Sequence, residues 1–282
     1  MIHRFILLLI LGLDALILFF QTSQISISSH EATLLYGEFS FLQLLINSSL
    51  TSFGQSDFAL RLPMITMHLL SVVFLYVISD EYIKQRRNRI WMILIFTLLP
   101  GVISSALLID SAGLVIFALL LFLYVYKKHS EKFALLLLLP YSVVDAGFVY
   151  LFASIAIFGI YEKKKDFVLV SLLALLSSIY IYGIDVGGIP VGHFLDSIGI
   201  YSAIFTPIIF IYLVYILYRK ILTKEIELLW FLSALPLLLS LVFSFRQRIE
   251  IEHFAPYLIV ALPLAAQTFE SSYRVRLKEF RR

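Results

Sequence analysis

Two acidic side chains, Glu31 and Asp110, lie just beyond apolar stretches, at points where the chain would emerge on the same side of a membrane. A carboxylate beside a reacting hydroxyl can act as a general base. Asp110 could instead be the N-cap of the helix that follows, because aspartate is a favoured capping residue. We expect Glu31 and Asp110 to be catalytic residues, with capping as the alternative role for Asp110.

Three arginines, Arg61, Arg246 and Arg248, are expected on that same side. The planar guanidinium group binds phosphate through paired hydrogen bonds, so the three are candidates for holding a phosphate group. Two of them belong to the segment RQRIEIEHF, residues 246–254. Its alternating charges could also be no more than a solvated edge of the membrane domain.

Five further side chains are candidates for binding a substrate or a metal ion: His30, Asp145, His193, Asp196 and His253. His193 and Asp196 are three residues apart, so one helical turn would place them on one face. Asp145 interrupts an apolar region, and an acid at such a place usually faces a cavity or a partner. Any cofactor is expected to be a divalent cation, Mg²⁺ or Mn²⁺, which prefer oxygen ligands.

Asp14 and His68 lie inside apolar stretches rather than at their ends. Burying an ionisable group in a membrane is costly, and such groups are usually paired or face a cavity. We expect Asp14 to be a hydrogen-bonded structural acid and His68 a satisfied core residue. The alternative is that Asp14 and Asp145 line a path for a solute.

The composition is that of a membrane protein. Of the 282 residues, 61% are apolar and 15% are charged, and the mean hydropathy is +0.95, whereas soluble domains are about half apolar and about a quarter charged. There are no cysteines, which excludes disulfides and thiolate chemistry. The net charge of +3 gives no indication of a nucleic-acid partner, and we expect none.

The apolar stretches predict an all-α integral membrane protein with about ten transmembrane helices, within a range of eight to eleven. The expected spans are 4–21, 60–80, 90–109, 111–126, 133–144, 146–161, 167–184, 201–218, 228–245 and 254–269. The pair covering 133–161 could also be one broken helix or a re-entrant hairpin. We expect residues 1–282 to form a single membrane domain without a soluble C-terminal domain.

Basic residues alternate along this map. They cluster in the connections at 84–89, 127–132, 163–165 and 219–224 and in the tail from 274. The positive-inside rule then places both termini in the cytoplasm and residues 22–57 in the first extracytoplasmic loop. Residues 39–50 of that loop have the pattern of an amphipathic helix in the interface plane. Such a helix could simply pack on the bundle, or it could line a groove for a lipid tail.

Four stretches resemble a known family of membrane enzymes. They are HEA (30–32), FGQSDFALRLPMITMHLLSVVFLYVIS (53–79), SALLIDSAGLVIFALLLFLYVY (105–126) and PYLIVALPLAA (256–266). In this order they are similar to motifs of the polyprenyl-phosphate-sugar glycosyltransferases with the C-type membrane fold. That family includes the lipid A aminoarabinose transferases and the protein O-mannosyltransferases. The resemblance is best over about residues 20–130.

The resemblance implies transfer of a sugar from a polyprenyl-phosphate donor to a glycan, lipid or protein acceptor at the outer face of a bacterial inner membrane. Glu31 would be the base that deprotonates the acceptor hydroxyl, and Asp110 would position a substrate or a metal ion. The chain departs from the family pattern in having His30-Glu31 in place of an Asp-Glu doublet. A non-catalytic membrane protein is the alternative, either a subunit that binds lipid-linked sugar or a small transporter.

Overall fold

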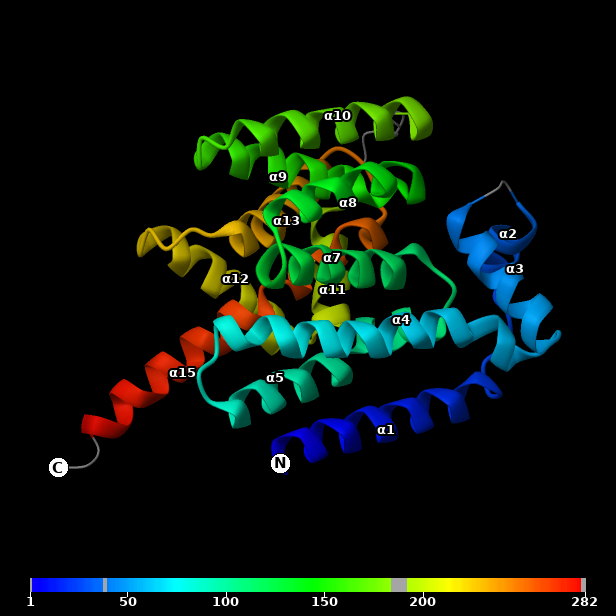
Figure 1. The fold of residues 1–282 in the computed structure, drawn as a ribbon, viewed down its shortest axis with the longest axis horizontal. Helices are drawn as coiled ribbons and strands as arrows, with labels where there is room; N and C mark the ends of the chain where they lie inside the picture. Colours follow the sequence, from blue (N-terminus) through cyan, green and yellow to red (C-terminus); the bar gives the residue numbers. More distant parts are fainter. Residues whose placement is uncertain (1, 38–39, 184–191, 280–282) are drawn as a thin grey trace.

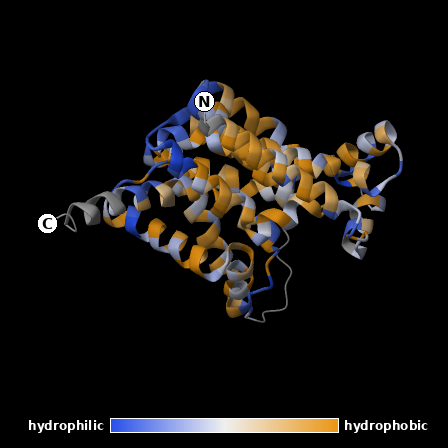
Figure 2. Cartoon of the chain, turned by 90° about the horizontal axis from the view of Figure 1, so that it is seen from below, coloured by the Kyte–Doolittle hydropathy of each residue, from blue (hydrophilic) through white to orange (hydrophobic). Residues whose placement is uncertain are grey.

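Helices account for 83% of the chain in the computed structural model, which describes residues 2–37, 40–183 and 192–279. No β-strand occurs in these three ranges. The prediction of an all-α protein is therefore confirmed. Hydrophobic residues make up most of the middle of the bundle and hydrophilic residues gather toward its ends, as the colouring of the ribbon in Figure 2 shows. That distribution is the one expected of a protein whose helices lie in a membrane.

The helices run back and forth between the two ends of one bundle (Figure 1). The α-helices are α1 (Ile2–Thr22), α2 (Ser29–Tyr36), α3 (Phe41–Phe53), α4 (Asp57–Ile78), α5 (Arg86–Leu98), α6 (Pro100–Leu107), α7 (Ser111–Lys128), α8 (Glu131–Val144), α9 (Val149–Tyr161), α10 (Lys165–Tyr182), α11 (Phe194–Phe205), α12 (Pro207–Leu222), α13 (Leu228–Ser244), α14 (Ala255–Ile259) and α15 (Leu262–Glu279). Short 3₁₀ turns are η1 (Ser79–Glu81), η2 (Ala146–Phe148) and η3 (Ile251–His253).

Four helices are long and apolar enough to cross a membrane, and the number rises to six if two bent pairs each count as one span. The four are in α1, α4, α7 and α10. The prediction of about ten spans is not supported, because the remaining apolar helices are shorter or bent. The pair α5 and α6 bends by 62°, and the pair α11 and α12 bends by 106°. Pro100 begins α6 and Pro207 begins α12. Proline disfavours the helical conformation in the residue before it, so the preceding helix ends at each of these points.

The segment 133–161 forms two separate helices, α8 and α9, joined by η2. Asp145 ends the first helix in an extended conformation and its carboxylate accepts a hydrogen bond from the Gly147 N–H, 2.7 Å away. Both α8 and α9 pack on α10. Of the alternatives left open by the sequence, the structure has two short helices around a polar turn.

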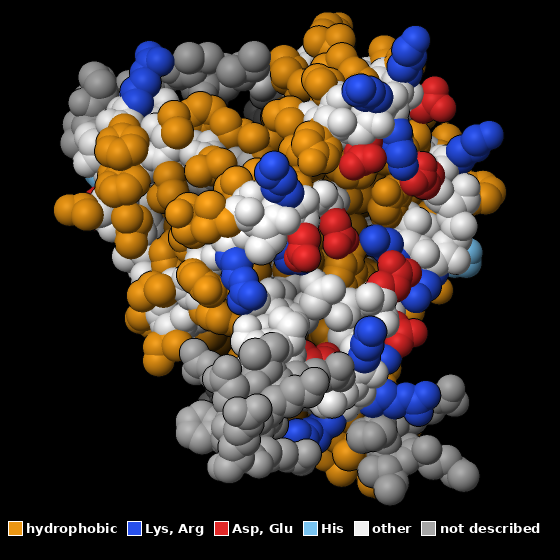
Figure 3. All heavy atoms as spheres, turned by 90° about the vertical axis from the view of Figure 1, so that its left-hand side faces the viewer, with side chains coloured by type: hydrophobic (Ala, Val, Ile, Leu, Met, Phe, Trp, Pro, Cys, Tyr) orange, Lys and Arg blue, Asp and Glu red, His pale blue; other side chains and the backbone are white. Residues whose placement is uncertain are grey.

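The connections that carry the basic clusters meet at one end of the bundle, at the left of Figure 1. Glu81, after α4, forms ion pairs with Lys127 and Lys128 at the end of α7, at 3.4 and 3.2 Å. Lys164, before α10, pairs with Glu131 at the start of α8, 2.6 Å away. Figure 3 shows the lysines, arginines and acidic side chains interspersed on this face. We name it the basic end.

Helix α3 is the helix expected over residues 39–50, and it packs on α4. Leu42 and Ile46 are buried against Leu60 of α4, and the Ser49 hydroxyl donates to the carbonyl of Ala59, 2.5 Å away. The apolar side of this amphipathic helix is thus used to hold the first connection against the bundle.

Asp14 of α1 and His68 of α4 form a polar contact inside the apolar layer, with 2.7 Å between Oδ2 and Nε2. His68 also stacks on Phe96, with 5.8 Å between ring centroids. Polar contacts between membrane helices are worth about 0.6 kcal/mol on average and about 1.7 kcal/mol at most. We expect Asp14→Ala to lower the free energy of unfolding by about 1 kcal/mol, measured by denaturation in detergent micelles. An unchanged stability would contradict a structural role for the pair.

Candidate functional site

Glu31 is buried, and both of its carboxylate oxygens have partners. Oε1 accepts hydrogen bonds from the Arg61 guanidinium and from the Ile109 N–H, each 3.1 Å away. Oε2 accepts from the Ser28 N–H at 2.8 Å, and the Ser28 hydroxyl accepts in return from the Glu31 N–H. This reciprocal pair is a capping box that begins α2. Only 1% of Glu31 is exposed.

Arg61 is fully buried on α4. Besides Glu31, its guanidinium donates to the carbonyls of Leu107, Ile25 and Ser26, at 2.5, 3.1 and 3.4 Å. These contacts tie the end of α1 and the end of α6 together. We expected Arg61 to bind a donor phosphate, whereas in the structure its two terminal nitrogens bond protein oxygens and no surface of the side chain is accessible.

Glu31 was expected to be the base, which needs an oxygen within reach of the acceptor hydroxyl, whereas both of its oxygens are buried and already accept hydrogen bonds from the protein. The structure makes Glu31 the support of the turn that leads to Asp110, through the Ile109 N–H. His30 is its neighbour in α2, and the His30 side chain lies outside the described part of the chain.

Burial raises the pKa of Glu31. The hydrogen bonds from Ser28 and Ile109 and the charge of Arg61 together lower it by more than burial raises it, so the net pKa lies below the ordinary 4.5. A carboxyl whose pKa is lower in the folded state stabilises that state above its unfolded pKa, and the contribution is lost as the pH falls through the folded value. We expect unfolding to become easier below about pH 4.5. Glu31→Gln should flatten this acid limb in thermal melts at graded pH. A variant whose acid limb matches that of wild type would contradict the assignment.

Asp110 is the N-cap of α7, and its Oδ1 accepts from the Gly113 N–H at 3.3 Å. The alternative prediction, that Asp110 caps the helix that follows it, is therefore confirmed. The half-buried carboxylate also lines a cavity of about 180 Å³, which Glu252 lines from the segment after α13. Two acids from distant parts of the chain thus share one cavity. Capping occupies a carboxylate only in part, because it has about four acceptor sites.

His253 lies at the centre of a polar cluster next to this cavity. Its Nε2 is 3.1 Å from Glu250 Oε2, and its Nδ1 is 3.7 Å from Asp145 Oδ1 and 3.4 Å from the Ser111 hydroxyl. A serine–histidine–acid relay needs the serine and the acid on different ring nitrogens. Here Ser111 and Asp145 share Nδ1, so the cluster does not have the geometry of a nucleophilic triad.

The charges in this cluster depend on one another. Burial raises the pKa of Asp145, and although His253 and the Gly147 N–H lower it, the net direction is upward. Burial lowers the pKa of His253, but the hydrogen bond to Glu250 and the charges of Asp145 and Glu252 raise it above 6.5. A histidine with a raised pKa retains a proton at neutral pH more readily, so without a metal ion His253 adds positive character beside two acids, and a cation that bound its ring nitrogen would displace that proton.

Gly147 allows the close approach of these side chains. A Cβ atom there would lie 2.9 Å from His253 Nδ1 and 3.0 Å from Asp145 Oδ1. We expect Gly147→Ala to lower the free energy of unfolding by about 1–3 kcal/mol, the usual cost of overpacking, as measured by thermal melts. Gly199→Ala is the matched control, because nothing lies within 4 Å of a Cβ there. Equal effects of the two changes would contradict the close approach.

Glu250, Glu252 and His253 offer three ligand atoms that all lie within 4.8 Å of one another. Two carboxylates and an imidazole suit Mn²⁺ or Zn²⁺ better than Mg²⁺, which prefers oxygen ligands alone. His253 is one of the candidates expected from the sequence, whereas the two glutamates are not. The sequence does contain a pattern that could have indicated this group, because the spacing E-x-E-H brings all three side chains together when residues 251–253 form a 3₁₀ turn.

A second cavity, of about 350 Å³, is lined by Arg248, His193 and Asp196, and Ile200 lines both cavities. His193 Nδ1 and Asp196 Oδ2 are 2.9 Å apart, as their spacing predicts. Arg246 is exposed and lines neither cavity. Of the three arginines expected to bind phosphate, only Arg248 therefore lies beside the acids. Residues 184–191 of the loop before His193 lie outside the described residues.

The turns around residues 110, 145, 193 and 250 thus meet at one end of the bundle, away from the basic end. Hydrogen bonds join them across the fold, including one from the His193 N–H to the carbonyl of Ser244, 2.9 Å long. We call the two adjoining cavities with their polar side chains the acidic site. Comparisons with known proteins found no matching family, no similar curated protein and no similar solved structure.

Proposed function

We propose that the protein is a membrane glycosyltransferase that moves a sugar from a polyprenyl-phosphate donor to an acceptor hydroxyl on the extracytoplasmic face. The observation that carries the proposal is that Asp110 and Glu252 line one cavity and the adjoining cavity holds Arg248. Transfer of this kind needs a base for the acceptor and a cation for the leaving phosphate. The order of the motifs that resemble the C-type family supports the same reaction.

In this proposal Asp110 takes the proton of the acceptor hydroxyl. The acceptor oxygen forms a bond to the anomeric carbon of the sugar while the bond from that carbon to the phosphate oxygen breaks. The electron pair leaves with the polyprenyl phosphate, whose negative charge Arg248 stabilises. Glu250, Glu252 and His253 would hold a divalent cation against the phosphate, and Glu31 positions the turn that carries Asp110.

The proposed orientation follows from the charges at the two ends. Lysines and arginines gather at the basic end (Figure 3), which the positive-inside rule assigns to the cytoplasm. The acidic site then opens on the other side of a bacterial inner membrane, and both termini are cytoplasmic. The acceptor class remains a glycan, a lipid or a protein.

The test is transfer of radiolabelled sugar from a panel of polyprenyl-phosphate donors in membranes that contain the protein, with membranes from cells without it as the blank. We expect product above the blank, a decrease after treatment with EDTA, and recovery with Mn²⁺. No product with any donor would favour the non-catalytic alternative. Solute flux in vesicles, compared between wild type and Asp145→Asn, would then be measured.

A further inference from the structure

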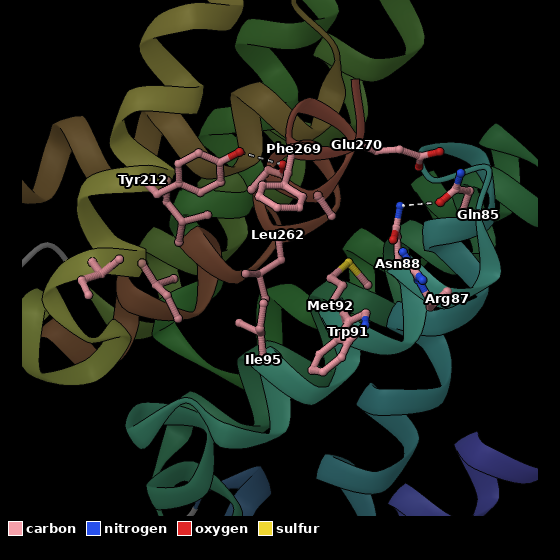
Figure 4. Close-up of a pocket in the computed structure, with 15 residues that line it drawn as sticks. Gln85, Arg87, Asn88, Trp91, Met92, Ile95, Tyr212, Leu262, Phe269 and Glu270 are labelled. Atoms are coloured by element: carbon pink, nitrogen blue, oxygen red, sulfur yellow. Dashed lines mark hydrogen bonds between the residues drawn. The ribbon is translucent and has the colours of Figure 1, made fainter. Parts of the chain in front are cut away.

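A groove with a volume of about 880 Å³ lies between α5, α12 and α15, and it shares no lining residue with the acidic site. Its walls are mostly apolar and include Trp91, Ile95, Tyr212, Leu262 and Phe269 (Figure 4). Trp91 and Phe269 are 60% and 61% exposed, respectively. A cavity of this size is in the range that binds small ligands, and exposed aromatic rings on a membrane protein contact lipid.

The polar residues of the groove collect at one place. Gln85, Arg87 and Asn88 come from the first turn of α5 and the residue before it, and Glu270 comes from α15 (Figure 4). Arg87 is exposed, and the Asn88 side-chain amide donates to the Gln85 side-chain oxygen, 3.2 Å away. This place belongs to the basic end, since Arg87 lies in the first turn of α5, the helix that follows η1. The groove is thus amphipathic, with its charged residues at the basic end and apolar residues along the rest of its walls.

The two charges have opposite signs. A guanidinium group binds phosphate oxygens, and a carboxylate accepts hydrogen bonds from an ammonium group. Glu270 is 7% exposed and already has a partner, but a carboxylate has about four acceptor sites and can bind a second donor. A ligand that matches the groove therefore has a phosphate, a nearby ammonium and an apolar tail.

We propose that this groove binds one phospholipid whose headgroup carries both a phosphate and a primary ammonium, as in phosphatidylethanolamine. The phosphate lies at Arg87, the ammonium at Glu270, and one acyl chain lies along Trp91 and Phe269. The lipid belongs to the leaflet at the basic end. This site is independent of the proposed transferase reaction, because none of its residues lines the acidic site.

Trp91 is a built-in reporter for the test, because the chain has only one other tryptophan, Trp230. The full-length Trp230→Phe variant is reconstituted in phosphatidylcholine vesicles that contain a rising fraction of brominated phosphatidylethanolamine or brominated phosphatidylglycerol, and Trp91 quenching is recorded. We expect phosphatidylethanolamine to quench at the lower mole fraction. Arg87→Gln should raise the mole fraction for half-maximal quenching by about tenfold, as expected for one charge-assisted hydrogen bond.

Arg86→Gln is the matched control, since Arg86 is also exposed in the first turn of α5 but does not line the groove. It should leave the quenching curve unchanged, whereas Glu270→Gln should remove the preference for phosphatidylethanolamine over phosphatidylglycerol. A thermal melt of each variant verifies folding. Equal quenching by the two lipids in wild type, a preference for phosphatidylglycerol, or equal effects of Arg86→Gln and Arg87→Gln would overturn the proposal.

Discussion

Asp110→Asn is expected to reduce sugar transfer by at least about 100-fold, the lower limit of what a general base usually contributes. Asparagine cannot accept a proton at neutral pH, but it caps helices about as well as aspartate. The hydrogen bond from the Gly113 N–H should therefore persist, and α7 should form as before. Initial rates from a labelled polyprenyl-phosphate donor, at equal amounts of folded protein, provide the measurement.

Asp57→Asn is the matched control for this loss. Asp57 is an exposed acid in the first turn of α4 and lines neither cavity of the acidic site. Its substitution should leave the rate within about twofold of wild type, because surface changes away from a site have small effects. Undiminished transfer by folded Asp110→Asn would remove Asp110 as the base. Glu252, on the same cavity, would then be the next candidate to substitute.

Arg61→Leu is expected to lower the free energy of unfolding by about 3–5 kcal/mol, the usual cost of leaving one partner of a buried ion pair unpaired. Glu31 would keep its charge in a site where only 2% of its side chain is exposed, and three backbone carbonyls would lose their donor. Equilibrium denaturation in detergent micelles measures the change. Protonation of Glu31 would offset part of the cost, so the loss should be smaller in acid.

The exposed ion pair between Lys164 and Glu131 is the control. Its side chains are 34% and 47% exposed, and exposed pairs contribute about 0–1 kcal/mol. Glu131→Gln should therefore have little effect. If Arg61→Leu cost no more than Glu131→Gln, the buried pair would not be a structural support.

The sequence predicts the helices well, because long apolar runs admit few alternatives in a membrane. It predicts the number of spans poorly, because α11 and α12 look like one continuous run. Thr206 interrupts that run with a φ of 61°, a conformation that β-branched residues rarely adopt. Such a backbone is imposed by tertiary packing, and Pro207 is the only local signal of the break.

At the acidic site, the sequence predicts contacts between residues that are close together in the chain. The cap at Asp110 and the pair of His193 with Asp196 depend on three-residue spacings that any helix start would satisfy. The pairing of Glu31 with Arg61 depends on how a loop folds back over a helix thirty residues later, which no local pattern encodes. The sequence thus marks Glu31 as a candidate base but does not predict that its carboxylate faces inward, against Arg61.

The bend at Thr206 has a further consequence for how the two binding regions communicate. Ile204 and Phe205, before the bend, line the cavity of Asp110, whereas Ile208 and Ile209, after it, line the groove. The six residues 204–209 thus form a partition with a ligand space on either side. If a ligand displaced this partition, the other space would change too, and thermodynamic linkage would require the effect on affinity to be equal in both directions. Lipid in the groove and substrate at Asp110 would then be energetically coupled through a single stretch of backbone.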